Sequence, residues 1–300
     1  MARMTIKSVL LSAAILLACA NALADDVILK PFVLASKGDG TVAEKSAQVK
    51  TALTTAGLTI VGEYAPYDGA DIVIVTSDEL KKNAAASEFG GYGAIQRVAI
   101  TGVGKEVQVS YTNPVYMANV YRMKDDLGGV AATLEKALGK VEEFGAKGMT
   151  AKQARKYHYM FGMEYFNEPS VLAEYDSYEE AVQAVDAKLT KNEYGVSKVY
   201  RVDIPGKQES VFGVGMKGSG DNKAMDDKYI MSEIDFRDLK STAHLPYEVL
   251  VSGNKVYALY ARFRIAINFP DLSMMGAHSF MNIMKAPETI RIALQNTVKK

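Results

Sequence analysis

The segment Thr41–Leu53, TVAEKSAQVKTAL, has a counterpart 136 residues later (177 − 41) in Ser177–Leu189, SYEEAVQAVDAKL. Each begins with a hydroxyl residue that is followed three positions later by glutamate. This pattern is typical of the first turn of a helix, where the hydroxyl and the glutamate each accept a backbone N–H. Both segments therefore predict capped helices, and their similarity indicates that the chain contains two copies of one unit.

The residues around the two helices also correspond. Val33-Leu34-Ala35 precedes the first helix, and Val171-Leu172-Ala173 precedes the second. Residues 101–105, TGVGK, and 251–255, VSGNK, each separate two β-rich runs, so both predict hairpins. The second copy is longer mainly because of a Gly/Asp/Lys-rich stretch, KGSGDNKAMDDK, which predicts a surface loop.

Each copy thus predicts a strand, a helix, two strands, a polar segment, a hairpin and a closing helix. We expect the α+β class: two tandem copies of a curved antiparallel β-sheet domain with helices packed on one face. The expected ranges are 25–146 and 167–300, joined by a linker with a short helix at 147–166, and Pro114 aligns with Pro270. The predicted strands are VILKPFVLA, LTIVGEY, DIVIVTS, AIQRVAIT and EVQVSYT, then SVLAEY, VSKVYRVD, SVFGVGM, YEVLVSG and VYALYARFRIAINF.

The N-terminus predicts a secretory signal peptide over residues 1–24. Two basic residues precede the apolar run VLLSAAILLACA, and Ala22-Leu23-Ala24 fits the small-x-small pattern before a cleavage site at Asp25. We therefore expect a periplasmic or secreted protein with no transmembrane segment. A lipid anchor on Cys19, the single cysteine, is the alternative interpretation.

The charge of the chain does not favour a polyanionic partner. Lys+Arg and Asp+Glu are both 35, and loss of Arg3 and Lys7 with the signal would leave 33 − 35 = −2. Nucleic-acid binding is therefore not expected. Without Cys19 the processed chain would hold neither a disulfide nor a thiol, so its stability has to come from packing.

The second copy resembles a known family. The run HLPYEVLVSGNKVYALY, followed by NFPDLSMM and a closing helix, is similar to the domain-of-unknown-function 302 family, whose signature is a Leu-Pro turn that opens a hairpin. The resemblance covers 165–298 well and 27–143 more weakly, because the first copy has FGGYGAIQRVAI where Leu-Pro would stand. The family often has cysteine after Leu-Pro, whereas this chain has Tyr247. The resemblance implies a fold that tends to dimerise, hence an intramolecular pseudo-dimer or a homo-oligomer, and no particular activity.

Motifs for catalysis or nucleotide binding are weak. Gly213-x-Gly215-x-x-Gly218 matches a dinucleotide fingerprint literally, but the residues after it make a poor helix start, so we expect turn glycines. The chain has no G-x-S-x-G, H-E-x-x-H or C-x-x-C motif. These absences disfavour a hydrolase or isomerase, which stays the weakest of the functional hypotheses.

Two groups of residues are candidates for binding. Alternation along VYALYARFRIAI would place Tyr260, Arg262 and Arg264 on one strand face, where an arginine could bind an anionic ligand or support an exposed sheet face. His244 and Tyr247 flank the Leu-Pro turn and complete the candidate ligand set.

Methionine and histidine form the second group. MMGAHSFMNIM, residues 274–284, would place Met274, His278 and Met281 on one helix face, and His158 lies close to Met160. Thioether and imidazole groups suit Cu(I), and the two histidines could also ligate haem. The same spacing is typical of apolar packing, so both interpretations stay open.

The leading functional hypothesis is a non-catalytic binding or accessory protein for an undetermined small ligand or protein partner. Its site is expected where the two copies meet, because concave sites favour domain interfaces. The alternative is a periplasmic Cu(I)- or haem-handling protein.

Overall fold

The computed structural model describes residues 27–160 and 162–300. The predicted signal peptide, its cleavage site and Cys19 lie outside the described residues. Within the described ranges, no helix combines the length and the apolar character needed to cross a bilayer.

The first sheet is antiparallel and has six strands in the order β3-β4-β5-β6-β2-β7. A separate two-stranded pair, β1 with β8, ties the start of the described chain to the linker. The bounds of these strands are β1 Ile28–Leu29, β2 Phe32–Asp39, β3 Thr59–Tyr64, β4 Ala70–Thr76, β5 Gln96–Val103, β6 Glu106–Thr112, β7 Glu142–Phe144 and β8 Met149–Thr150.

The second sheet repeats this order. It is also antiparallel, with five strands in the order β10-β11-β12-β13-β9. Apart from the added β7, every strand of the first sheet has a counterpart at the same place in the second, which is the connectivity that two copies of one unit produce. The bounds are β9 Ser170–Glu174, β10 Val196–Asp203, β11 Glu209–Met216, β12 Tyr247–Ser252 and β13 Lys255–Ala258.

Two long helices pack on one face of each sheet. Helices α2 and α5 contact the first sheet, and α7 and α10 contact the second, which confirms the predicted α+β class. The bounds are α2 Val42–Thr55, α3 Asp78–Ala85, α4 Pro114–Val120, α5 Gly128–Leu138, α6 Ala151–Arg155, α7 Tyr178–Thr190, α8 Asp227–Ile234, α9 Ala261–Asn268 and α10 Ala286–Val298. Short 3-10 turns are η1 Gly90–Gly93, η2 Glu193–Gly195, η3 Gly220–Met225, η4 Thr242–His244 and η5 Phe280–Ile283.

The helix caps agree closely with the sequence pattern. Thr41 Oγ1 accepts from the N–H of Glu44 at 3.2 Å, and the Glu44 carboxylate accepts from the N–H of Thr41 at 3.0 Å. Ser177 Oγ accepts from the N–H of Glu180 at 3.1 Å. The Glu180 carboxylate accepts from the N–H of Asp176 instead of Ser177, so the second box is only half formed.

The prediction of one long strand over VYALYARFRIAINF is wrong. Strand β13 ends at Ala258, and the residues from Ala261 form α9. All but one of the eight residues of α9 are buried, and a helix buried on every side has no polar face to reveal its period. The alignment of Pro114 with Pro270 is also wrong, because Pro114 begins α4 whereas Pro270 follows the end of α9.

The glycine motif has a role that we did not predict. Gly213 and Gly215 lie inside strand β11 and not in a turn; only Gly218 lies beyond the strand. A Cβ at Gly213 would lie 2.0 Å from the ring of Tyr200, and one at Gly215 would lie 2.4 Å from the ring of Tyr64. The glycines therefore make room for aromatic rings.

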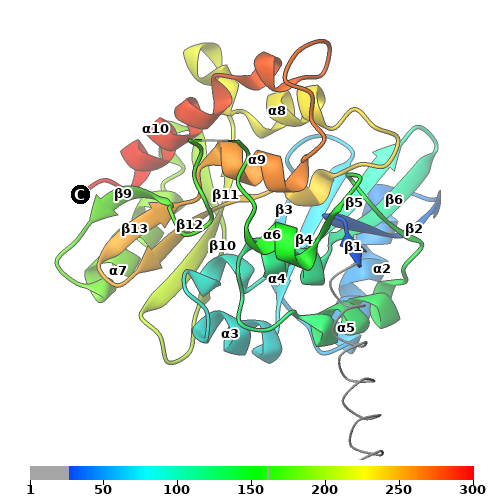
Figure 1. Ribbon diagram of the computed structural model, residues 1–300, viewed down its shortest axis with the longest axis horizontal. Helices are drawn as coiled ribbons and strands as arrows, with labels where there is room; N and C mark the ends of the chain where they lie inside the picture. Colours follow the sequence, from blue (N-terminus) through cyan, green and yellow to red (C-terminus); the bar gives the residue numbers. More distant parts are fainter. Residues whose placement is uncertain (1–26, 161) are drawn as a thin grey trace, which may run out of the picture.

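The two sheets lie side by side and meet in the middle of the molecule (Figure 1, first sheet to the right and second to the left). Edge strands β3 and β10 approach so closely that a Cβ at Gly62 would lie 2.7 Å from the carbonyl oxygen of Val199. Further along, the N–H of Gly91 donates to Glu209 at 2.7 Å, and Thr101 Oγ1 donates to Thr242 at 2.9 Å. The interior between the sheets is therefore built by both halves of the chain.

We expect Gly62→Ala to destabilise the protein by roughly 1–3 kcal/mol, because the new methyl group would meet backbone on the facing strand. Gly38→Ala is the matched control: Gly38 also lies in a strand, and a Cβ there would meet no atom within 4 Å. Chemical denaturation of both variants measures the difference. Equal stabilities would contradict the close approach of β3 and β10.

Candidate functional site

A buried group of charges joins the two halves. Arg97 of β5 forms an ion pair with Glu248 of β12, and Arg264 of α9 lies with Nη1 3.1 Å from the other carboxylate oxygen of Glu248. All three residues are at most 2% exposed. This ion triad consists of two cations and one anion, an expensive combination to bury in an apolar interior.

Arg264 is also bound by the Leu-Pro turn. Its Nη2 donates to the carbonyl oxygen of His244 at 2.7 Å, and its Nη1 donates to that of Pro246 at 3.1 Å. The guanidinium lies 4.4 Å from the centroid of the Tyr247 ring. The Leu245-Pro246 turn thus positions the buried arginine.

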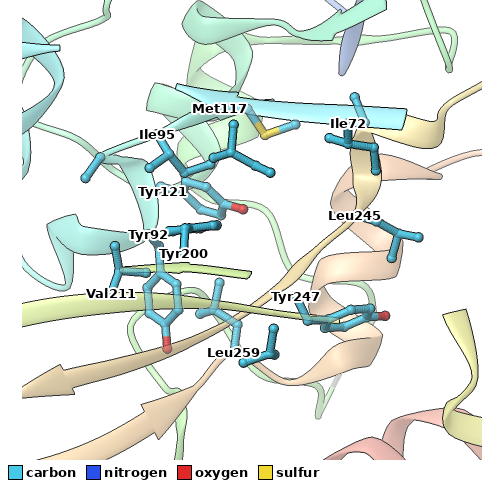
Figure 2. Packing of buried hydrophobic residues seen from close by; sticks show 14 of the residues in the cluster. Ile72, Tyr92, Ile95, Met117, Tyr121, Tyr200, Val211, Leu245, Tyr247 and Leu259 are labelled. Carbon is cyan, nitrogen blue, oxygen red and sulfur yellow. The ribbon is translucent and has the colours of Figure 1, made fainter. Parts of the chain in front are cut away.

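Polar side chains around the ion triad lack hydrogen-bond partners among the described residues. The groups without a hydrogen-bond partner are Arg97 Nε, Arg264 Nε, both ring nitrogens of His244, and the hydroxyls of Tyr92, Tyr121, Tyr200 and Tyr247. Arg97 Nη2 and both carboxylate oxygens of Glu248 are held by the ion pairs alone. Figure 2 shows these four tyrosines among the apolar side chains packed where the halves meet. Buried polar groups are nearly always paired, so this concentration of polar groups without hydrogen-bond partners marks the interior between the sheets as the candidate site.

Burial sets the protonation states in this polar cluster, which comprises the ion triad, His244 and the four tyrosines. Burial lowers the pKa of His244 well below its ordinary value, and the arginines at 97 and 264 lower it further, so the imidazole is neutral. Burial lowers the pKa of Arg97, and electrostatic repulsion from Arg264 lowers it further. Burial raises the pKa of Tyr200 to about 12, so its hydroxyl stays protonated. With one carboxylate between two guanidinium groups, the cluster is rich in donors and carries net positive charge.

A second buried carboxylate lies at the same junction. Oδ2 of Asp227 accepts from the Tyr64 hydroxyl at 2.6 Å and from the N–H of Met216 at 2.9 Å, while its Oδ1 has no partner among the described residues. Burial raises the pKa of Asp227 from 3.8 to about 7 despite these two hydrogen bonds. Asp227 is therefore largely neutral below that pH.

Solvent reaches the junction through a cleft. A cavity of about 660 Å³ and a neighbouring one of about 260 Å³ share Tyr67, Asp68 and Lys228, and residues of both halves line each of them. The Tyr67 hydroxyl lies 3.2 Å from Thr242 Oγ1. Thr242 belongs to η4, which ends at His244, so a residue that lines the cleft contacts the same short turn that carries His244.

The five residues of the predicted ligand set divide between two places. Arg264, His244 and Tyr247 come together in the polar cluster. Arg262 and Tyr260 lie elsewhere, next to each other: Arg262 is 5.2 Å from the Tyr260 ring and donates to Glu164 at 2.6 Å. The common strand face that we predicted does not exist, because these residues are on or beside a helix, where positions two apart point in different directions.

The predicted metal set also divides. Residues 273–279 are not helical, so the predicted helix face with Met274, His278 and Met281 is wrong. The ring of His278 stacks on Phe236, with centroids 4.8 Å apart, and His158 Nδ1 lies 2.9 Å from the carbonyl oxygen of Met160. Haem ligation by either histidine stays a prediction.

The described residues do not bring together a recognisable catalytic group. Within 27–160 and 162–300, no histidine hydrogen-bonds to a Ser or Thr hydroxyl, and no three His, Cys, Asp or Glu side chains are placed to hold a metal ion.

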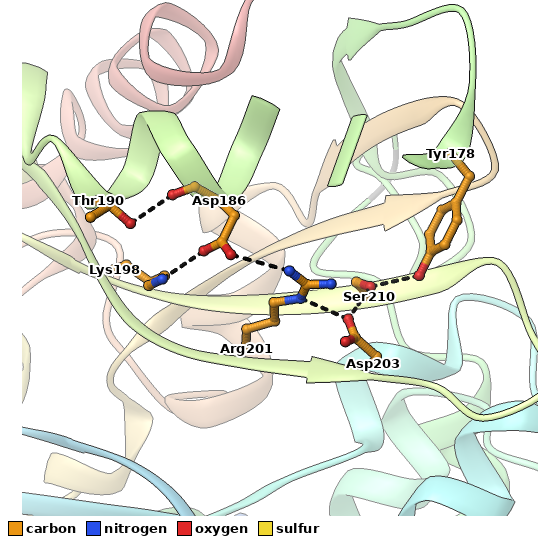
Figure 3. A network of polar contacts seen from close by, with 7 residues as sticks. All are labelled: Tyr178, Asp186, Thr190, Lys198, Arg201, Asp203 and Ser210. Atoms are coloured by element: carbon orange, nitrogen blue, oxygen red, sulfur yellow. Dashed lines mark hydrogen bonds and ion pairs between the residues drawn. The ribbon is translucent and has the colours of Figure 1, made fainter. Parts of the chain in front are cut away.

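Figure 3 shows a network of polar contacts on α7, β10 and β11 that joins a helix to a sheet. Its ion pairs are partly exposed, and exposed ion pairs contribute little to stability. Its members are Tyr178, Asp186, Thr190, Lys198, Arg201, Asp203 and Ser210.

The sequence analysis missed Arg97, Glu248 and Asp227. One signal was present for the first two: each is a charged residue next to or within a predicted apolar run, AIQRVAIT and YEVLVSG. A charge at such a position has to be paired or functional when the strand is buried on both faces.

Comparisons of the chain with protein-family models, curated proteins and solved structures found no match in any of the three. The resemblance to the domain-of-unknown-function 302 family therefore stays a prediction. The polar cluster has to be interpreted from its own geometry.

We expect Asp227→Asn to flatten part of the pH dependence of stability. Because the folded-state pKa of Asp227 is raised to about 7, the folded protein holds a proton that the unfolded chain loses near pH 3.8, so stability falls as pH rises between these values. The asparagine oxygen can still accept from Tyr64 and Met216 and carries no charge. The variant should therefore gain unfolding free energy relative to the parent as pH rises from 4 to about 7.

Urea denaturation across this pH range measures the effect, with Asp226→Asn as control, since asparagine also caps a helix well and Asp226 caps α8. A constant difference between Asp227→Asn and the parent at every pH would contradict the assignment of a raised pKa.

Proposed function

We propose that the protein is a non-catalytic binding protein whose ligand is a small anion held between the two halves of the chain. The observation that carries the proposal is that two buried guanidinium groups share the single carboxylate of Glu248, while Nε of each arginine has no hydrogen-bond partner among the described residues. A purely structural interface does not need such groups, because apolar side chains of similar size stabilise an interior at least as well as buried ion pairs do.

The chemistry of the donors supports an anion. Nε of Arg97, Nε of Arg264 and the Tyr200 hydroxyl can each donate a hydrogen bond, and none has a partner among the described residues. Among the described residues, Glu248 is the one carboxylate that forms an ion pair with Arg97 or Arg264. Two positive charges therefore share one negative charge, and one positive charge is left without a partner. A carboxylate, phosphate or sulfate group would supply both the missing acceptors and the missing charge.

The surroundings limit the size of the ligand and indicate its route. The polar cluster is fully enclosed by packed side chains, which favours a ligand of few atoms. The cleft over Tyr67 and Thr101 provides a route, since both contact Thr242 at the start of η4.

We expect a small anion to stabilise the protein at constant ionic strength. Phosphate, sulfate and acetate are the probes, with chloride as the reference, and thermal unfolding is the measurement. An anion present at about a hundredfold excess over its Kd adds about 2.7 kcal/mol of unfolding free energy. Arg264→Met should abolish this gain while the protein still folds, because Glu248 keeps Arg97 as its partner. Arg262→Met is the matched control, two residues away on the same helix but outside the polar cluster.

Tyr200→Phe separates a binding role from a structural one. Removing a buried hydroxyl that has no partner should leave the ligand-free protein as stable or slightly more stable. The same change should weaken the stabilisation by the anion. The proposal fails if no probe stabilises the protein beyond chloride, or if Arg262→Met loses as much of the effect as Arg264→Met.

A further inference from the structure

Four methionines from two distant segments line one surface cavity. Met160 and Met163 come from the linker, and Met274 and Met284 come from the segment that precedes α10. The cavity has a volume of about 260 Å³. The Tyr159 hydroxyl donates to the sulfur of Met274, which joins the two segments.

Apolar packing does not explain these side chains. Met160, Met274 and Met284 are 44%, 40% and 57% exposed, whereas a methionine that fills a gap in a core is buried. Exposing several large apolar side chains side by side is unfavourable and usually marks a place of interaction. The thioether sulfur is the one group that distinguishes these side chains from leucine.

The chemistry of the thioether selects the kind of ion. It is a soft, neutral ligand that cannot offset the charge of a divalent cation, and it favours soft monovalent ions such as Cu(I). The charges around the cavity are already paired: Arg262 donates to Glu164 at 2.6 Å, and Arg291 lies 2.6 Å from Glu288. A monovalent cation would therefore meet little net repulsion from these arginines.

The imidazole groups that the sequence analysis grouped with these methionines do not line the cavity, and neither does Met281, which lies in a neighbouring hollow with Tyr229 and Lys285. Methionine has three rotatable side-chain bonds, so its sulfur can turn toward a bound ion without a change of backbone.

We propose that Met160, Met163, Met274 and Met284 form a binding site for one soft monovalent metal ion, Cu(I) or Ag(I), with thioether sulfur as the only ligand type. This site is separate from the proposed anion site, and neither depends on the other.

Ag(I) is the probe, because it is soft and monovalent and does not change its oxidation state in air. The protein carries Cys19→Ser, so that the single cysteine cannot bind silver, and the buffer contains no chloride. Native mass spectrometry and calorimetry should report one Ag(I) per chain. The double variant Met163→Leu/Met274→Leu should bind roughly tenfold more weakly or worse, since leucine keeps the volume and removes the sulfur.

Met275→Leu and Met281→Leu are the matched controls, because both methionines are at least half exposed, lie in the same segment and are absent from the cavity. They should bind Ag(I) like the parent. Circular dichroism shows whether each variant is folded, and Met160→Leu/Met284→Leu replaces the first double variant if that one is not. Failure of the parent to bind Ag(I), or equal loss of binding in the two controls, would overturn the proposal.

Discussion

Glu248 lies between two buried arginines, one from each half of the chain, and the arrangement of the halves depends on this contact. Arg97 comes from the middle of the first sheet, and Arg264 comes from the helix that follows the last hairpin. Loss of Glu248 would leave two arginines without a compensating charge in an apolar interior. The two sheets can therefore slide or separate only if charges become unpaired or meet a new partner.

The same contact distinguishes this junction from ordinary packing. Glycines at 62, 213 and 215 bring strands and aromatic rings close together, which would by themselves make a well-packed interior. The arginines, His244 and the tyrosine hydroxyls are added to that interior although packing does not require them. The two guanidinium groups share one carboxylate, and an anionic ligand would supply a second negatively charged group.

The chain contains two kinds of candidate site with opposite chemistry. Inside the junction the groups are cationic, hydrogen-bonding and enclosed, whereas the cavity beside α10 offers neutral sulfur at the surface. Both lie next to α9. Arg264 belongs to the polar cluster, and Arg262, two positions earlier, lines the methionine cavity.

Local sequence patterns predicted the parts of the fold that local interactions determine. The capping box at Thr41 and the hairpin turns at Gly104 and Gly253 depend on residues a few positions apart, so the local sequence was enough to predict them. Helix α9 could not, because burial on all sides removes the periodicity of its sequence. The pairing of Arg97 with Glu248 joins residues from different halves of the chain, and nothing in either segment identifies its partner. Of the residues in the candidate site, the sequence analysis predicted only Arg264, His244 and Tyr247. The argument for Arg264 assumed that it lies on a strand, whereas it lies on helix α9.

The most direct measurement replaces the whole ion triad at once. In Arg97→Met/Glu248→Leu/Arg264→Met no buried charge is left unpaired, so the variant should fold with an unfolding free energy in chloride at least equal to that of the parent. It should show no additional stabilisation by phosphate, sulfate or acetate. A variant that keeps the anion effect of the parent would contradict a ligand site in the junction, and a variant that cannot fold would show that the charges serve folding and not binding.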